Sequence, residues 1–249
     1  MNIAVCVNHV PDTASKIKLD SSNTSIDYTG VSWILNPFDE FAIEEALRFK
    51  DNSSGTVVYI LSAGKDEAKE TIRRALSMGA DEGILIKNDL ALDSLSISEL
   101  LAMQIKELNC EVVFCGKQSV DYDNTSIGLM IAEIIDYNAI SDCVTLSIEG
   151  STVKAEREIE GGREIIETSL PLVVTAQKGL NVPRYASLKG IIAAKKKNIK
   201  EVTLTSSTST VKYNSLSIPN AKNPGRVLGS DSGAVRELVR LLREEAKVL

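Results

Sequence analysis

Short apolar runs alternate with helical patterns through the first half of the chain, and this alternation limits the possible folds more than any other feature. The runs occupy residues 3–7, 56–61, 83–86 and 112–115. The first run is followed by a polar, turn-rich stretch and a further apolar run at 31–35 before a helical pattern begins, and each of the others is followed by a segment in which apolar residues recur with helical spacing. Strands without polar alternation are buried on both faces, which is typical of parallel sheets covered by helices. The pattern therefore predicts an α/β fold with a doubly wound, mostly parallel sheet.

The pattern changes after about residue 138. Apolar and polar residues alternate at 144–148, 152–158 and 163–168, and Gly-containing turns separate these segments. This arrangement predicts an antiparallel β-meander appended to the sheet. Residues 172–175, Leu-Val-Val-Thr, are three apolar residues and a threonine in a row, and they predict one further buried strand.

The last fifth of the chain differs again. Residues 200–229 are polar and contain Pro219 and Pro224, which predicts an extended arm, and residues 231–247 have the spacing of an amphipathic helix. A terminal helix this far from the core packs either on its own chain or on a partner. We therefore expect an α/β domain over residues 1–199, with a loop region at about 176–198, and an arm with its helix over 200–249.

Composition argues against several classes of function. The formal net charge is −6 and aromatic residues make up 4% of 249, so the basic surface of a nucleic-acid-binding protein is not expected. The four cysteines form no Cys-x-x-Cys pair and there is one histidine, so we expect neither disulfides nor a metal site. No apolar run reaches the ~20 residues of a membrane span, and no signal or transit peptide is recognisable. We therefore expect a cytoplasmic protein of a prokaryote.

The loop at residues 116–128 combines several features of a binding site. It lies between an apolar run and a helical pattern, and ligands bind at the carboxyl ends of strands in open α/β sheets. Residues 123–126 are all good N-cap residues, so a helix is expected to begin among them. Free N–H groups at a helix start bind phosphate, and Lys117 would add positive charge. From spacing alone an ordinary capped turn between strand and helix is favoured, since neither nucleotide-binding glycine motif is present.

Other loops are expected at the same edge of the sheet. Residues 8–13 and 62–64 also follow predicted strands, and a helix is predicted to start at Asn36 as its cap, with Pro37 in its first turn. Because the carboxyl ends of parallel strands meet at one edge, these loops together predict a nucleotide site. Asp121 and Asp123 are either a magnesium pair or solvated loop acids. We recognise no catalytic constellation.

A basic cluster lies near the end of the first domain. Lys195, Lys196 and Lys197 end a predicted helix that follows Ser187. Lysines at a helix end complement its dipole, so a solvated helix end accounts for them. Together with Leu188 at the helix start, they also fit a docking surface with an apolar anchor and a charged rim.

Several motifs together identify a family. They are Val-Pro-Asp-Thr at 10–13, Asn-Pro-Phe-Asp-Glu at 36–40 followed by Glu-Glu-Ala-Leu at 44–47, residues 75–81, Gly-Lys-Gln at 116–118 with Asp121, Asp123 and Gly128, residues 157–162, Pro-Arg-Tyr-Ala at 183–186, and Ala-Lys-Lys-Lys at 194–197. On these motifs the chain resembles the β subunit of electron transfer flavoprotein over nearly its whole length.

The resemblance implies a heterodimeric electron carrier rather than an enzyme. In this family the β subunit commonly holds AMP, and the α subunit holds most of the FAD. The heterodimer accepts electrons from flavoprotein dehydrogenases, often the acyl-CoA dehydrogenases of fatty acid oxidation, and passes them to a membrane quinone oxidoreductase. The C-terminal arm and helix would pack on the α subunit, and the loop at 10–13 would approach its flavin.

The resemblance also implies two sets of residues. The nucleotide contacts would be Cys6, Asn36, Pro37, Phe38, Asp39, Ala63, Gly116, Lys117, Gln118, Ser119, Val120, Asp121, Tyr122, Asp123, Asn124, Thr125, Ser126 and Ile127. Recognition of partner proteins would use Arg184, Tyr185, Leu188, Lys195, Lys196 and Lys197.

Two departures from the family leave alternatives open. Ser126 stands where the family usually has Gln, and Thr13 is shared with members that bifurcate electrons and bind a second FAD in place of AMP. The motifs at 36–40 and 194–197 favour AMP. Outside the family, an adenine-nucleotide hydrolase or ligase using Asp121 and Asp123, or a nucleotide-sensing homodimer, would fit the same sheet.

Overall fold

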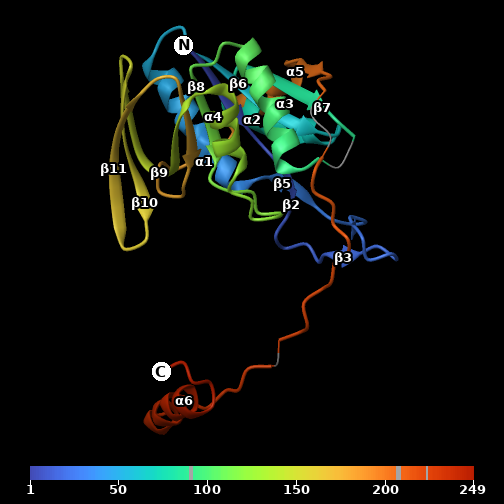
Figure 1. Ribbon diagram of the computed structural model, residues 1–249, viewed down its shortest axis with the longest axis vertical. Coiled ribbons are helices and arrows are strands. Elements are labelled where there is room, and N and C mark those ends of the chain that lie inside the picture. Colours follow the sequence, from blue (N-terminus) through green and yellow to red (C-terminus); the bar gives the residue numbers. More distant parts are fainter. Residues whose placement is uncertain (90–91, 206–208, 223) are drawn as a thin grey trace.

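The computed structural model describes residues 1–89, 92–205, 209–222 and 224–249. A nine-stranded sheet forms its centre, in the order β11-β10-β9-β12-β8-β1-β6-β7-β13 (Figure 1). Six of these strands run parallel to their neighbours: β1 (Asn2–Cys6), β6 (Val57–Gly64), β7 (Glu82–Lys87), β8 (Val112–Gly116), β12 (Leu172–Ala176) and β13 (Ile199–Val202). The predicted parallel sheet is confirmed.

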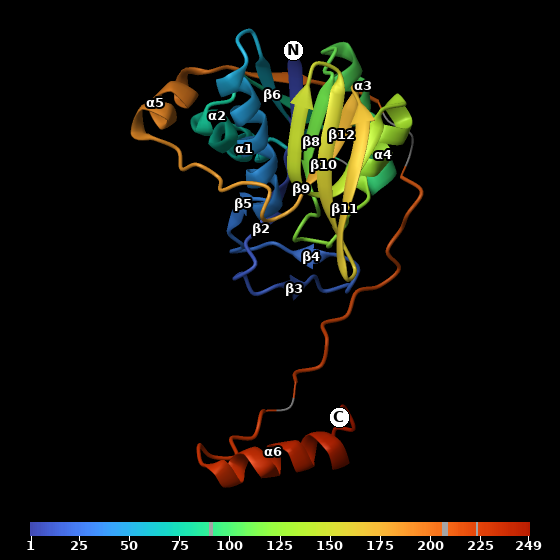
Figure 2. The same cartoon turned by 90° about the vertical axis from the view of Figure 1, so that its left-hand side faces the viewer.

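Helices cover both faces of the sheet (Figure 2). One face carries α1 (Pro37–Asn52) and α2 (Ala68–Met78), with α5 (Leu188–Lys196) packed on α2, and the other carries α3 (Ser94–Glu107) and α4 (Ile127–Ile135). Alternate residues of β1 enter the two cores: Ile3 and Val5 face α1, whereas Ala4 and Cys6 face α3 and α4. Burial on both faces explains why the strand sequence is apolar throughout, and the fold is doubly wound as predicted.

The order of the strands reverses beside β1. The chain first adds β6 and β7 on one side of β1, and then returns to place β8 on the other side. Where two crossovers leave neighbouring strands in opposite directions, their loops diverge and leave a crevice at the carboxyl ends. The fold therefore places a crevice between the ends of β1 and β8.

The antiparallel meander extends the sheet at one edge. It consists of β9 (Asn138–Glu149), β10 (Thr152–Ile159) and β11 (Gly162–Ser169), with β9 also pairing parallel to β12. Two small hairpin sheets lie at the carboxyl-end side: β2 (His9–Pro11) pairs with β5 (Trp33–Leu35), and β3 (Lys18–Leu19) with β4 (Ile26–Asp27). The predicted meander is thus present.

The C-terminal segment begins inside the sheet rather than beyond it. Strand β13 pairs with β7, so the expected boundary between residues 199 and 200 falls within a strand. Beyond it the arm leaves the body and ends in α6 (Ser232–Glu244), which lies apart from the rest of the chain (Figures 1 and 2). No residue of α6 is buried. Of the predicted arm, residues 206–208 and 223 lie outside the described residues.

Candidate functional site

A cleft with a cavity volume of about 80 Å³, open to solvent, lies at the reversal point of the sheet. The ends of β1, β6 and β8 form its floor, and the starts of α1 and α4 and one side of α3 form its walls. Predicted contacts that line it are Cys6, Asn36, Asp39, Ala63, Gly116, Lys117, Gln118, Ser119, Asn124, Thr125 and Ile127.

Other residues of the cleft were not predicted as contacts. Ile97 and Leu101 of α3 form an apolar wall, and Val7, Asn8, Cys115 and Gly128 complete the lining. Conversely, the predicted contacts Pro37, Phe38, Val120, Asp121, Tyr122, Asp123 and Ser126 are not among the lining residues. They flank the cleft in sequence and support the residues that form it.

The carboxylate of Asp39 joins three of the converging segments. Its Oδ2 accepts a hydrogen bond from the backbone N–H of Asn8 (2.7 Å). Its Oδ1 accepts from Asn36 Nδ2 (2.8 Å) and from the backbone N–H of Gly116 (3.1 Å). The ends of β1 and β8 and the start of α1 are therefore tied to one side chain, which is 4% exposed.

Burial raises the pKa of Asp39 to about 7, and the three donated hydrogen bonds oppose this shift. Removing a carboxylate from water disfavours its charged form, whereas N–H donors favour it. Asp39 therefore connects the segments of the cleft although burial disfavours its charged form, and the three N–H donors offset that effect only in part.

Asn36 occupies the N-cap position of α1, but its side chain does not cap the helix. Instead its Nδ2 donates to Asp39 and to the carbonyl oxygen of Gln118 (2.9 Å), and its Oδ1 accepts from the backbone N–H of Val120 (3.3 Å). The predicted capping role of this side chain is wrong, because its hydrogen bonds go to backbone groups of the loop after β8 and not to the first N–H groups of α1.

The 116–127 loop holds its shape through its own polar side chains. Asp121 accepts hydrogen bonds from Ser119 Oγ and from the backbone N–H of Tyr122 (2.8 Å). Asp123 accepts from Gln118 Nε2 (2.9 Å). The two carboxylates have separate partners, and the described residues contain no group of three His, Cys, Asp or Glu side chains placed to hold a metal ion.

Helix α4 begins at the cleft without a side-chain cap. Asn124 accepts from the backbone N–H of Ser126 (2.9 Å), one residue before the helix. The next N–H groups have no partner within the helix, because the first turn of any helix lacks acceptors. Gly128 allows this end to approach the sheet, since a Cβ there would lie 2.7 Å from Thr175 Cγ2. The cleft thus contains the positive end of a helix, which suits an anion.

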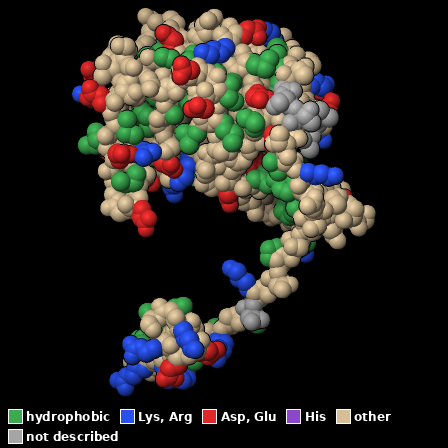
Figure 3. All heavy atoms as spheres, viewed as in Figure 1, with side chains coloured by type: hydrophobic (Ala, Val, Ile, Leu, Met, Phe, Trp, Pro, Cys, Tyr) green, Lys and Arg blue, Asp and Glu red, His purple; other side chains and the backbone are tan. Residues whose placement is uncertain are grey.

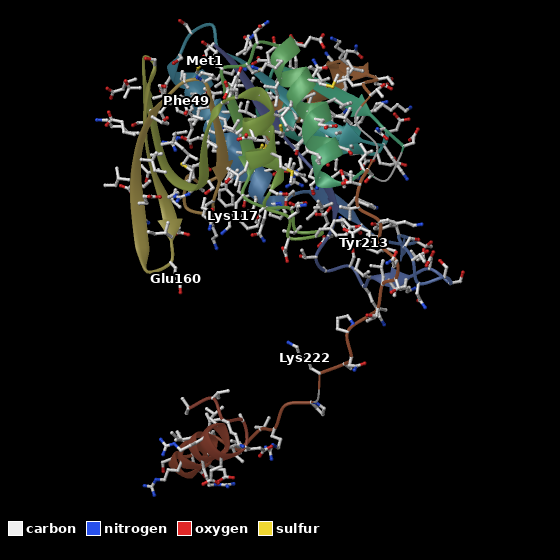
Figure 4. The ribbon with its side chains drawn as sticks, viewed as in Figure 1. Met1, Phe49, Lys117, Glu160, Tyr213 and Lys222 are labelled. Carbon is white, nitrogen blue, oxygen red and sulfur yellow. The ribbon has the colours of Figure 1, made fainter. Side chains whose placement is uncertain are left out.

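Lys117 lies where the strands end near the start of α1 (Figure 4). Its Nζ pairs with Asp142 Oδ1 at 3.0 Å, and its backbone N–H donates to the carbonyl oxygen of Ala176 (2.9 Å). The positive charge expected beside a phosphate is therefore already shared with a carboxylate.

Two buried thiols form part of the floor. Cys6 and Cys115 are paired residues on neighbouring parallel strands. The hydrogen bond with Cys115 and burial together raise the pKa of Cys6. The Cys6 thiol is therefore kept protonated, and both buried side chains contribute to the shape of the floor.

The residues predicted to recognise partner proteins are divided by the structure. Tyr185 and Leu188 are 98% and 74% exposed, and Lys195 and Lys196 are exposed on α5. Arg184 instead points into its own chain, where it forms ion pairs with Glu44 (2.8 Å) and Asp51 (2.9 Å). Lys197 donates to the carbonyl oxygen of Ala80. Arg184 and Lys197 therefore attach this region to the body.

None of the helices in the described part of the chain is both long and apolar enough to cross a membrane. Exposed apolar side chains include Leu188 at the start of α5 and Val235 and Leu238 on α6.

Comparison with known proteins places the chain in a family. Residues 24–207 match the family described as electron transfer flavoprotein domain. The electron transfer flavoprotein subunit beta of Bacillus subtilis (strain 168) is 37% identical over 260 aligned positions that cover all of both chains. The same-named protein of Sus scrofa is 37% identical, covering 98% of this chain and 97% of its own. These matches confirm the resemblance indicated by the motifs: the chain belongs to the family of electron transfer flavoprotein β subunits.

Proposed function

We propose that the chain binds AMP in the cleft between β1 and β8 and works as the β subunit of a heterodimeric electron carrier. The uncapped start of α4 at the reversal point of the sheet is the observation that carries the nucleotide proposal. That end would hold the single phosphate of AMP. The apolar side chains of Ile97, Leu101 and Ala63 would contact the adenine ring.

FAD, held mainly by the partner α subunit, would supply the redox chemistry of the carrier. In this proposal the residues of the β subunit do no chemistry of their own. They bind the nucleotide, shape the surface against the flavin-bearing subunit and present residues 184–197, which we call the docking region, to dehydrogenases. The carrier would work in the cytoplasm between acyl-CoA or related dehydrogenases and a membrane quinone oxidoreductase.

Helix α6 supports the proposed heterodimer. Val235, Leu238, Val239 and Leu242 recur at helical spacing on one side, and the first three are 61%, 47% and 40% exposed. Charged side chains gather on the visible face of the helix (Figure 3). Within α6, Arg240 pairs with Glu237 and Glu244. An amphipathic helix whose apolar side has no cover on its own chain suits a groove on a partner.

The docking region supports the proposed dehydrogenase contact. Leu188 is the first residue of α5. Ser187 caps this helix, because its Oγ accepts a hydrogen bond from the backbone N–H of Gly190 (3.0 Å). The leucine side chain is thus presented on a fixed helix start with lysines nearby. An exposed apolar anchor with a charged rim is the usual form of an interface hot spot.

The nucleotides of the purified heterodimer test the proposal. After denaturation, mass spectrometry should find one FAD and one AMP for each heterodimer. Two FAD would instead support a bifurcating carrier with the second flavin in this cleft. Magnesium-dependent ATP turnover by the pure chain, lost in Asp123→Ala, would favour a hydrolase and contradict the carrier proposal.

Two variants test the proposed partner surfaces. Leu238→Asp should prevent heterodimer formation, measured by size-exclusion chromatography, whereas Val227→Asp, at an exposed arm position outside α6, should not. Leu188→Ala should slow flavin reduction by an acyl-CoA dehydrogenase, whereas Ile165→Ala, an equally exposed apolar change on β11, should leave the rate unchanged.

A further inference from the structure

Beyond β13, the described part of the C-terminal arm includes a stretch that touches the body of the protein, residues 209–216, which we call the strap. Its first attachment is Asp93, the residue before helix α3. Asp93 Oδ2 accepts hydrogen bonds from the backbone N–H of Thr210 (2.6 Å), from Thr210 Oγ1 (3.0 Å) and from the backbone N–H of Val211 (3.2 Å). The backbone N–H of Asp93 in turn donates to Ser209 Oγ (3.0 Å).

Asp93 holds the strap with one oxygen and the helix with the other. Its Oδ1 accepts from the backbone N–H of Ser96 (2.9 Å) and caps α3. The hydrogen bonds donated by the backbone N–H groups of Ser96 and Thr210 lower the pKa of Asp93. The carboxylate is therefore charged at neutral pH, and hydrogen bonds to a charged acceptor are the stronger kind.

The second attachment is an aromatic contact with the 116–127 loop. The ring of Tyr213 stacks on that of Tyr122, with centroids 6.2 Å apart and planes 12° from parallel. Figure 4 shows Tyr213 on the lower side of the body, beside the small hairpin sheets. Further along, the backbone N–H of Leu216 donates to the carbonyl oxygen of Asn23 (2.8 Å).

These attachments fall on two segments that carry walls of the cleft, although neither Asp93 nor Tyr122 lines it. Asp93 caps the helix whose Ile97 and Leu101 form the apolar wall, and Tyr122 belongs to the 116–127 loop, which forms another wall through Gln118, Ser119 and Asn124. The walls also meet directly, because Asn124 Nδ2 donates to Ser94 Oγ. Tyr122 and Tyr213 remain 57% and 58% exposed, so the aromatic contact can open without unfolding the core.

We propose that the strap fastens the two walls of the cleft to each other, with Asp93 and Tyr213 as positioning residues, and thereby sets the rate at which a bound adenine nucleotide leaves. The inference rests on the proposed nucleotide site. The nucleotide leaves when the 116–127 loop moves away from α3, and the strap opposes that movement.

The test compares release rates in full-length variants. Asp93→Ser keeps a side-chain cap for α3 but removes the oxygen that holds Thr210 and Val211. Tyr213→Ala removes the stacked ring. The matched controls are Asp231→Ser, the same change at the cap of α6, and Tyr185→Ala, the same change at a 98% exposed tyrosine.

The probe is N-methylanthraniloyl-AMP, chased with unlabelled AMP in a stopped-flow fluorimeter. Asp93→Ser and Tyr213→Ala should each speed release about tenfold, the scale expected for losing a charged hydrogen-bond cluster or an aromatic contact. Both controls should match the wild type, and melting temperatures should stay close to it. Hydrogen exchange should be faster at Thr210 and Val211 in the two strap variants.

Two failures are distinguishable. If AMP binds the wild type in calorimetry but both strap variants release the probe at the wild-type rate, the strap proposal is overturned and the nucleotide site stands. If the wild type binds neither AMP nor the probe, the proposed nucleotide site itself falls, and the role of the strap falls with it.

Discussion

The backbone N–H of Gly116 points directly at the carboxylate of Asp39, at 3.1 Å, and leaves no room for a side chain. A Cβ on residue 116 would collide with Asp39 Oδ1 and would lie 2.8 Å from the backbone carbon of Phe38. The end of β8 and the start of α1 are thus in close contact. Because they are so close, the carboxylate of Asp39 on α1 can accept a hydrogen bond from the backbone of β8.

Gly116→Ala should therefore lower the free energy of unfolding by about 3 kcal/mol, the upper range for overpacking a buried site. It should also weaken AMP binding, because the end of β8 must move. Urea denaturation and calorimetry measure the two effects. Gly162→Ala is the control, since a Cβ there meets nothing within 4 Å, and a similar loss in both variants would contradict the steric argument.

Asp39 should make stability depend on pH. Its pKa is about 7 in the folded chain against 3.8 as the ordinary value, so between about pH 4 and pH 7 the folded state holds a proton that the unfolded state has lost. Stability falls with pH wherever the folded state binds more protons. The free energy of unfolding should decrease from pH 4 to pH 7 through this group, and flatten above it.

Asp39→Asn should remove this slope while lowering stability overall, because an amide N–H would face N–H donors. Urea denaturation at half-unit pH intervals measures both. Identical slopes in the wild type and the variant would mean that Asp39 keeps its charge across this range.

Arg184 should matter more for stability than its partial exposure suggests. It donates through Nε to Glu44 Oε2 (2.8 Å) and through Nη2 to Glu44 Oε1 (3.0 Å), and the Glu44 side chain is 7% exposed. Arg184→Ala leaves that buried carboxylate unpaired, which should cost about 3 kcal/mol. Arg226→Ala breaks an exposed pair with Glu245 and should have a much smaller effect, because water screens such a pair. If the two variants lowered the melting temperature equally, Arg184 would not be the residue that attaches the docking region to the body of the protein.

All four cysteines should resist thiol reagents in the native protein. Each is buried, and burial raises the pKa of both Cys110 and Cys143 to about 12. Because the thiolate is the reactive form, labelling by dithionitrobenzoate at pH 8 should be slow and should reach four equivalents only in denaturant. Fast labelling of one thiol before unfolding would show that a strand end opens locally.

The sheet could be predicted from the sequence because its signals are local. A run such as residues 112–115 is apolar at every position, and the helices between the strands carry their own spacing and caps. Strand β13 was missed for the opposite reason. Its sequence, Ile-Lys-Glu-Val, has a polar middle, and only the edge of β7, more than a hundred residues earlier, makes it a strand.

The candidate site could be predicted in position but not in detail. Loops that follow parallel strands meet at the carboxyl-end edge of the sheet, and this holds whichever partners their side chains have. The partners of those side chains depend on tertiary contacts: Asn36 binds Gln118, and Lys117 binds Asp142. Ile97 and Leu101 have the spacing of any core-facing helix, so nothing in the sequence marks them as cleft residues.

The central place of β1 has a consequence for biosynthesis. This strand leaves the ribosome before either of its neighbours, and β6 follows it before residues 112–116 do. Until β8 has emerged, one side of an apolar strand lacks its pairing partner, and unpaired strand edges favour association with other chains. We therefore expect a nascent chain that has not yet exposed residues 112–116 to be the species most prone to such association.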